Sequence, residues 1–179
     1  MKDARVRLVI AAATLLSSGC ARYPDPSPPP PQRAPVEAVS LPAPPTIVEM
    51  GGPGAERAIV KDITGGQTDS SWRWTGQAPA VRVPLKTTAG LKFHAEFAIP
   101  DVTFRETGPV TIRWMVNGRV LDTVRYARPG SEQFEKPVPP DWLKPNSENV
   151  AGAELDKIYV AKGDGAKLGV ILSRMGFVE

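Results

Sequence analysis

Hydrophobic and polar residues alternate along much of the second half of the chain. Residues 91–99 alternate over nine positions, which puts one set of side chains on a common face: Leu91, Phe93, Ala95, Phe97 and Ile99. Residues 110–116 alternate in the same way, and Asn117-Gly118 follows them. A period of two residues indicates a strand with one buried face. Asn-Gly favours a type I′ turn, because both turn positions need positive φ. We therefore predict a hairpin whose second strand is 119–126.

Shorter patterns extend this β-rich region on both sides. Residues 58–63 and 80–85 are predicted strands, and Pro84 in the second indicates an edge or a strand end. Two more predicted strands, at 157–161 and 168–178, follow a proline-rich loop and are joined by a hairpin turn at 162–166. Within the loop, residues 140–143 are predicted to open one helical turn. No segment of 47–179 shows a helical period, so we predict an all-β domain, an antiparallel β-sandwich or jelly roll.

The N-terminal residues 1–19 have the pattern of an export signal. Lys2, Arg5 and Arg7 precede an apolar run at 8–16, which is too short to span a bilayer. The run ends in Leu16-Ser17-Ser18-Gly19-Cys20, which resembles the signal of bacterial lipoproteins, although Ser17 stands where leucine is usual. The resemblance implies cleavage after Gly19 and lipidation of the Cys20 thiol. An ordinary secretory peptide with an incidental cysteine is the alternative.

A proline-rich segment separates Cys20 from the β-rich region. Residues 20–46 hold ten of the chain's 20 prolines, and proline prevents both helix and sheet. We predict an extended tether, with a reach on the order of 80 Å at most. A ligand for a proline-binding module is the alternative function of such a segment. The lipoprotein resemblance also implies a destination: Ala21, rather than an aspartate, after the cysteine favours the outer membrane of a bacterial cell envelope over the inner one.

The sequence offers little catalytic chemistry. His94 is the one histidine and lies on the polar face of its strand, where we expect it to be exposed or half-exposed and Glu96 to pair with it or with an arginine. The acidic residues show no pair suited to glycoside hydrolysis; the candidates are Glu96, Asp101, Glu106 and Asp122. We therefore predict no enzyme, metal or cofactor, and residues 51–54 are expected to end the tether rather than bind phosphate. A net charge of +3 without a basic stripe argues against nucleic acid.

Tryptophans are the best remaining candidates for a binding site. Trp72 and Trp74 lie two residues apart, so on a strand they face the same way, with Arg73 opposite. A flat aromatic ring can stack on a sugar while polar groups bind the hydroxyls. We therefore predict a ligand site at Trp72, Arg73, Trp74 and Trp142, with core packing as the alternative for Trp72 and Trp74. Trp142 is either an exposed platform or a lid over the sandwich edge, and Trp114 is expected in the core.

The order of these segments along the chain carries a further resemblance. Trp72-Arg73-Trp74-Thr75-Gly76, the long alternating strand, the Asn117-Gly118 hairpin and the final strand resemble the galactose-binding-like jelly-roll domains attached to bacterial glycosyltransferases and glycoside hydrolases. The resemblance covers about residues 58–178 and implies carbohydrate recognition or an accessory role. Two hypotheses follow for this predicted envelope lipoprotein: a non-catalytic module that binds carbohydrate or an envelope polymer, or an assembly component that docks protein partners through exposed strand edges.

Overall fold

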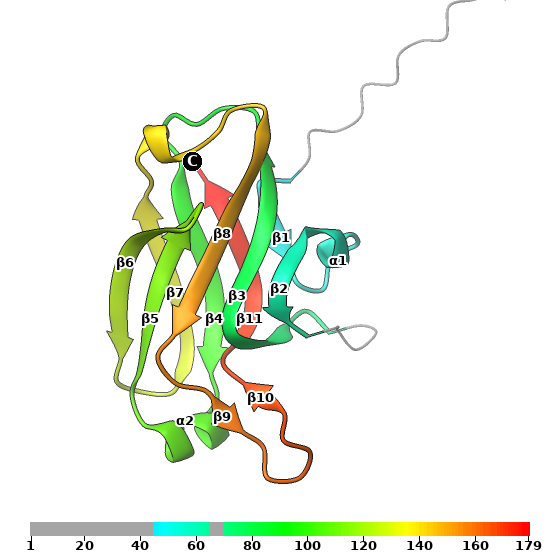
Figure 1. Ribbon diagram of the computed structural model, residues 1–179, viewed down its shortest axis with the longest axis vertical. Helices are drawn as coiled ribbons and strands as arrows, with labels where there is room; N and C mark the ends of the chain where they lie inside the picture. Colours follow the sequence, from blue (N-terminus) through cyan, green and yellow to red (C-terminus); the bar gives the residue numbers. More distant parts are fainter. Residues whose placement is uncertain (1–44, 65–69) are drawn as a thin grey trace, which may run out of the picture. The chain divides into compact units, whose positions relative to one another are not determined.

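Nine antiparallel strands form two facing layers in the computed structural model, which describes residues 45–64 and 70–179 (Figure 1). One layer runs β2 (Ile59–Ile63), β3 (Arg73–Leu85), β8 (Ser147–Leu155), β5 (Val110–Val116) and β6 (Arg119–Tyr126). The other runs β1 (Ile47–Glu49), β11 (Ile171–Val178), β4 (Lys92–Ile99) and β7 (Gly130–Pro137). The start of β3 also pairs with β11, which joins the layers. The predicted all-β sandwich is confirmed, while the signal segment, Cys20 and the tether to residue 44 lie outside the described residues.

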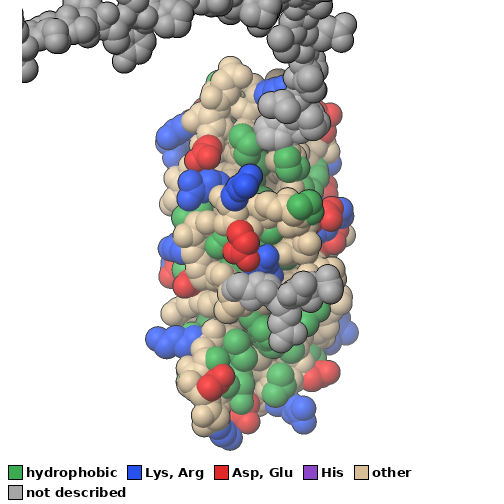
Figure 2. Space-filling view, turned by 90° about the vertical axis from the view of Figure 1, so that its right-hand side faces the viewer, with side chains coloured by type: hydrophobic (Ala, Val, Ile, Leu, Met, Phe, Trp, Pro, Cys, Tyr) green, Lys and Arg blue, Asp and Glu red, His purple; other side chains and the backbone are tan. Residues whose placement is uncertain are grey.

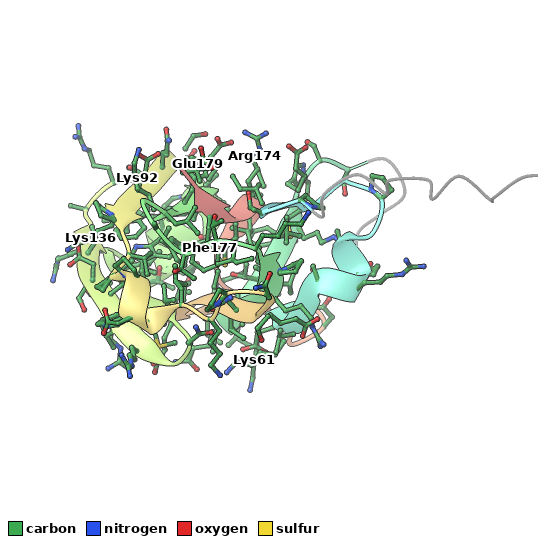
Figure 3. All side chains as sticks on the ribbon, turned by 90° about the horizontal axis from the view of Figure 1, so that it is seen from above. Lys61, Lys92, Lys136, Arg174, Phe177 and Glu179 are labelled. Atoms are coloured by element: carbon green, nitrogen blue, oxygen red, sulfur yellow. The ribbon has the colours of Figure 1, made fainter. Side chains whose placement is uncertain are left out.

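The core lies between the layers and follows the alternation in the sequence. All five side chains of the 91–99 face are buried, and Trp114 is 1% exposed. Its ring stacks on Phe134 with centroids 4.7 Å apart. Figure 3 shows Phe177 between the layers, Lys61 on one outer side, and Lys92 and Arg174 on the other. Each buried large apolar side chain stabilises the fold by about 1.5–3 kcal/mol, so this core holds the sandwich without a disulfide.

The predicted Asn117-Gly118 hairpin turn is confirmed. Asn117 and Gly118 have φ of 49° and 81°. The Asn117 side chain donates to the carbonyl of Trp142 at 2.8 Å and to Oδ1 of buried Asn149 at 2.9 Å. The hairpin is thereby fastened to β8 and to η1 (Pro140–Trp142), the helical turn that the sequence predicts.

The proline-rich loop predicted between 126 and 157 is wrong, because it contains β7 and β8. β7 is an edge strand with polar side chains on most positions, and only Phe134 is buried. β8 turns the small or polar residues Asn149, Ala151 and Ala153 inward, so hydrophobic alternation is weak in both strands. Two short helices were also not predicted: α1 (Ala55–Ala58) and α2 (Asp101–Thr107).

Close backbone contacts interrupt the last predicted strand. It is divided into β10 (Lys167–Leu168) and β11, because Gly169 between them donates to the carbonyl of Thr75 at 2.7 Å. β10 forms the predicted hairpin with β9 (Tyr159–Val160), which is shorter than expected. Figure 2 shows hydrophobic side chains gathered over the lower part of one side, where Figure 1 places β10.

Residues 51–54 are a packed turn, so the prediction that they end the tether is wrong. A Cβ on Gly51 would lie 2.6 Å from the carbonyl oxygen of Ser70. The segment before Trp72 therefore runs directly over this turn, and only glycine leaves room for it.

Candidate functional site

Two tryptophans lie at the start of β3 on the outer face of the sandwich: Trp72 immediately precedes the strand and Trp74 is its second residue. Trp72 and Trp74 touch edge to face, with ring centroids 6.5 Å apart, and Trp72 is 40% exposed. Trp74 lies opposite Ile171 of β11, which in turn lies opposite Ala98 of β4. Directly opposed residues share a face, so Trp74, Ile171 and Ala98 form one apolar surface. Trp72 extends this surface through its contact with Trp74. We call it the aromatic platform: Trp72, Trp74, Ile171 and Ala98.

Arg73 points to the other side of β3, as the alternation predicts. It is 8% exposed, and its Nε donates to the carbonyl of Met50 at 2.8 Å. Its Nη1 forms an ion pair with Glu56. The guanidinium therefore faces away from the aromatic platform and fixes the strand that carries both tryptophans.

A polar cleft of about 420 Å³ opens next to Trp72. Its lining combines hydroxyl, carboxylate, guanidinium and backbone groups, from Glu49, Gly51, Gly52, Ser70, Ser71, Ser173 and Arg174. The pairing of β11 with β4 shifts register between Leu172 and Arg174. Such a bulge bends a strand and redirects its side chains, so Ser173 and Arg174 both line the polar cleft. Trp72 follows Ser71 directly, which makes the platform and the cleft neighbours.

Charged side chains continue from the polar cleft across the same outer face. Arg174 donates to Glu49 at 2.6 Å and to Glu96 at 3.3 Å. His94 contacts Glu96 through Nε2 at 3.2 Å and Glu135 through Nδ1 at 3.4 Å. Lys92 donates to Glu135 at 3.1 Å. We call this series the charged row: Glu49, Arg174, Glu96, His94, Glu135 and Lys92.

His94 is buried, so the prediction of an exposed or half-exposed histidine is wrong. It lies on the polar face of β4, as predicted, but is only 6% exposed. Its cross-strand partner on β11 is Gly176, which has no side chain. The ring therefore has room on the sheet and is enclosed by Glu96 and Glu135. The predicted pairing of Glu96 is confirmed with both the histidine and a cross-strand arginine.

Hydrogen bonds hold two carboxylates of the charged row in their ionised form. Burial alone would raise the pKa of Glu96, but its bonds with His94 and Arg174 outweigh burial, and the pKa lies below the ordinary value of 4.5. The bond from Lys92, followed by that with His94, lowers the pKa of Glu135. Glu49 and Glu96 raise the pKa of Arg174. The face thus keeps fixed charges in neutral and mildly acidic solution.

Trp142 lies far from the aromatic platform. It precedes β8, whose first residue, Ser147, pairs with Leu85 at the far end of the 13-residue β3. At about 3.3 Å per residue this places it on the order of 30–40 Å from Trp72. Trp142 is half-buried, with the Arg119 guanidinium 5.5 Å from its ring centroid. The four predicted ligand residues therefore do not converge on one site.

The remaining candidates do not form a second cluster within residues 45–64 and 70–179. In this part of the chain no group of three or more potential ligands is placed to hold a metal ion, and no helix has the length and apolarity to cross a membrane. Asp122 forms an ion pair with Lys136 at 2.7 Å, away from the charged row. The sequence did not single out Glu49, Glu135, Ser173 and Arg174, because strand pairing and a bulge bring them together and no motif marks them.

Comparisons with solved structures find distant similarities. A family 35 carbohydrate-binding module from Clostridium thermocellum aligns with 74% of this chain and 96% of its own length, at 13% identity and TM-score 0.40. An exo-β-1,3-galactanase from Phanerochaete chrysosporium aligns over 76% and 29%, at 14% identity and TM-score 0.40. A family GH115 4-O-methyl-α-glucuronidase with specificity for decorated arabinogalactans aligns over 70% and 17%, at 13% identity and TM-score 0.40. No protein-family model matches the chain, and a search of curated proteins gives no match. Similarity at this level does not transfer a ligand or an activity.

Proposed function

We propose that the β-sandwich is a non-catalytic module that binds carbohydrate, such as a polymer of the cell envelope, at the aromatic platform and the polar cleft. The observation that carries the proposal is the exposed Trp72 ring, held edge to face by Trp74. A pyranose presents an apolar face of C–H groups and a rim of hydroxyls. The tryptophans match the apolar face, while serine hydroxyls, Glu49 and Arg174 match the rim.

The proposal includes a lipid anchor at Cys20 and a proline-rich tether to residue 46. Support comes from the signal resemblance and from where the tether would join the domain. Phe177 donates to the carbonyl of Thr46 at 2.7 Å, near the end of β11, whereas the platform includes Ile171 at its start. About 20 Å of strand separates the two points, so the chain enters the domain away from the platform. Labelling cells with a radioactive fatty acid should mark the wild-type chain and not Cys20→Ser; an unlabelled wild-type chain would contradict the anchor.

The alternative is an assembly component that docks protein partners through strand edges. Within the described part of the chain, four strands end the layers and have one partner each: β6 pairs with β5, β7 with β4, β1 with β11 and β2 with β3. All four carry charged residues, and Lys136 of β7 forms an ion pair with Asp122 of β6. Charged edges resist pairing with further strands. The edge geometry therefore favours the platform over the edges as the binding surface.

Affinity electrophoresis tests carbohydrate binding directly. The full-length protein is run in detergent through gels containing a neutral β-glucan, galactan, mannan or xylan, or soluble peptidoglycan. We expect at least one polymer to retard the wild type, little retardation of Trp72→Ala, and normal retardation of Trp142→Ala. Equal mobility of the wild type in all gels, together with co-purification of a fixed protein partner, would refute the proposal in favour of the alternative.

A further inference from the structure

We infer that this site selects uncharged sugar units and discriminates against uronates, because its charged row already uses its cations internally. The inference rests on the proposed carbohydrate-binding function and specifies its substrate class. It follows from the partners of Arg174 and from the balance of charges on the outer face.

Arg174 is the one cation that lines the polar cleft. Its Nη2 donates to Glu49 at 2.6 Å and its Nη1 to Glu96 at 3.3 Å. Recognition of a carboxylate by arginine normally uses two parallel N–H donors. Both terminal nitrogens already donate to carboxylates, so a uronate would reach only the remaining N–H groups of Arg174, next to two carboxylates of its own charge.

The rest of the charged row reinforces this preference. The row has three carboxylates, on Glu49, Glu96 and Glu135, and two permanent cations, on Arg174 and Lys92. Lys92 is paired with Glu135 at 3.1 Å. A carboxylate added in the polar cleft therefore lies near Glu49 and Glu96, which share the single positive charge of Arg174. The excess negative charge repels it.

A neutral sugar does not meet this obstacle. Its hydroxyls both donate and accept hydrogen bonds. They can donate to Glu49 and accept from the hydroxyls of Ser71 and Ser173 in the polar cleft without breaking the ion pairs of Arg174. The ion pairs thus hold the wall of the cleft in one arrangement that suits hydroxyl groups.

Calorimetry with matched polymers tests the selection. The full-length chain is titrated with a neutral β-glucan, galactan and mannan, with each polymer after oxidation of its C6 hydroxyls to carboxylates, and with the methyl esters of the oxidised polymers. For each neutral polymer that binds, we expect oxidation to weaken binding at least fivefold and esterification to restore most of the loss. The ratio of the affinity for the neutral polymer to that for its oxidised form should fall in Glu49→Gln and stay unchanged in Glu154→Gln, which alters a carboxylate paired with Arg113 on the other layer.

The outcomes separate the two proposals. Oxidised polymers that bind as well as or better than their neutral forms would overturn the charge selection and leave carbohydrate binding intact. A ratio unchanged in Glu49→Gln would overturn the role of the Arg174 ion pairs. Failure of all nine polymers to bind would overturn this inference, and if no electrophoresis gel retards the wild type either, the proposed function is overturned as well.

Discussion

Removal of the Trp72 ring should weaken ligand binding and leave the domain folded. The side chain is 40% exposed, and a tryptophan side chain offers about 250 Å² of surface, so about 100 Å² is available to a ligand. At about 25 cal/mol per Å² this surface can contribute up to about 2.5 kcal/mol when a sugar covers it. Partial to complete coverage gives about 1.5–2.5 kcal/mol, so Trp72→Ala should weaken binding by about 10- to 70-fold.

The same substitution should have a small effect on stability. The ring already lies partly in solvent, and its edge-to-face contact with Trp74 is worth about 0.5–1.5 kcal/mol. Isothermal titration calorimetry gives the dissociation constant, and urea unfolding of the same sample gives the stability. Val160→Ala is the matched control, because Val160 is 52% exposed on β9. A Trp72→Ala variant that is folded and binds as tightly as the wild type would refute the role of the platform.

Three further predictions concern the elements that support this face. Arg73→Met leaves the carbonyl of Met50 without its 2.8 Å donor, so urea unfolding should show a loss of about 2–3 kcal/mol; an unchanged unfolding free energy would contradict this anchoring role. Gly169→Ala places a Cβ 2.5 Å from the carbonyl oxygen of Gly76 and should cost about 2–3 kcal/mol. Thermal unfolding should show the loss, and an equally large one in Gly163→Ala, which has open space, would contradict the packing argument. Glu96 has a lowered pKa when folded, so its stabilising contribution is complete above pH 4.5 and is lost as the pH falls through that lower pKa. Glu96→Gln should therefore flatten the dependence of the unfolding free energy on pH below 4.5; an unchanged slope would contradict the ion pairing.

Local patterns in the sequence predict the fold well where one face of a strand is hydrophobic. The 91–99 and 110–116 strands and the hairpin at Asn117 are found as predicted. β7 and β8 are not, because the pairing partners of these strands, rather than their own hydrophobic residues, hold them in the sheet.

The candidate site is likewise predictable only in part from local sequence patterns. The shared face of Trp72 and Trp74 follows from their spacing, whereas the separation of Trp142 depends on the pairing of β8 with the far end of β3. The charged row joins residues from β1, β4, β7 and β11, and the bulge at Ser173 turns Arg174 into the cleft. No local pattern contains these long-range pairings, so the sequence pointed to the two tryptophans of the platform and missed Ile171, Ala98 and the polar half of the candidate site.

The indole N–H signals of the four tryptophans offer the most direct test of the central claim. The assigned ¹H–¹⁵N spectrum of the full-length protein is recorded while a neutral polysaccharide that binds it is added. Carbohydrate binding at the aromatic platform predicts that the signals of Trp72 and Trp74 shift and saturate together, while those of buried Trp114 and distant Trp142 stay in place. A shift confined to Trp142, or binding that moves neither Trp72 nor Trp74, would contradict the account.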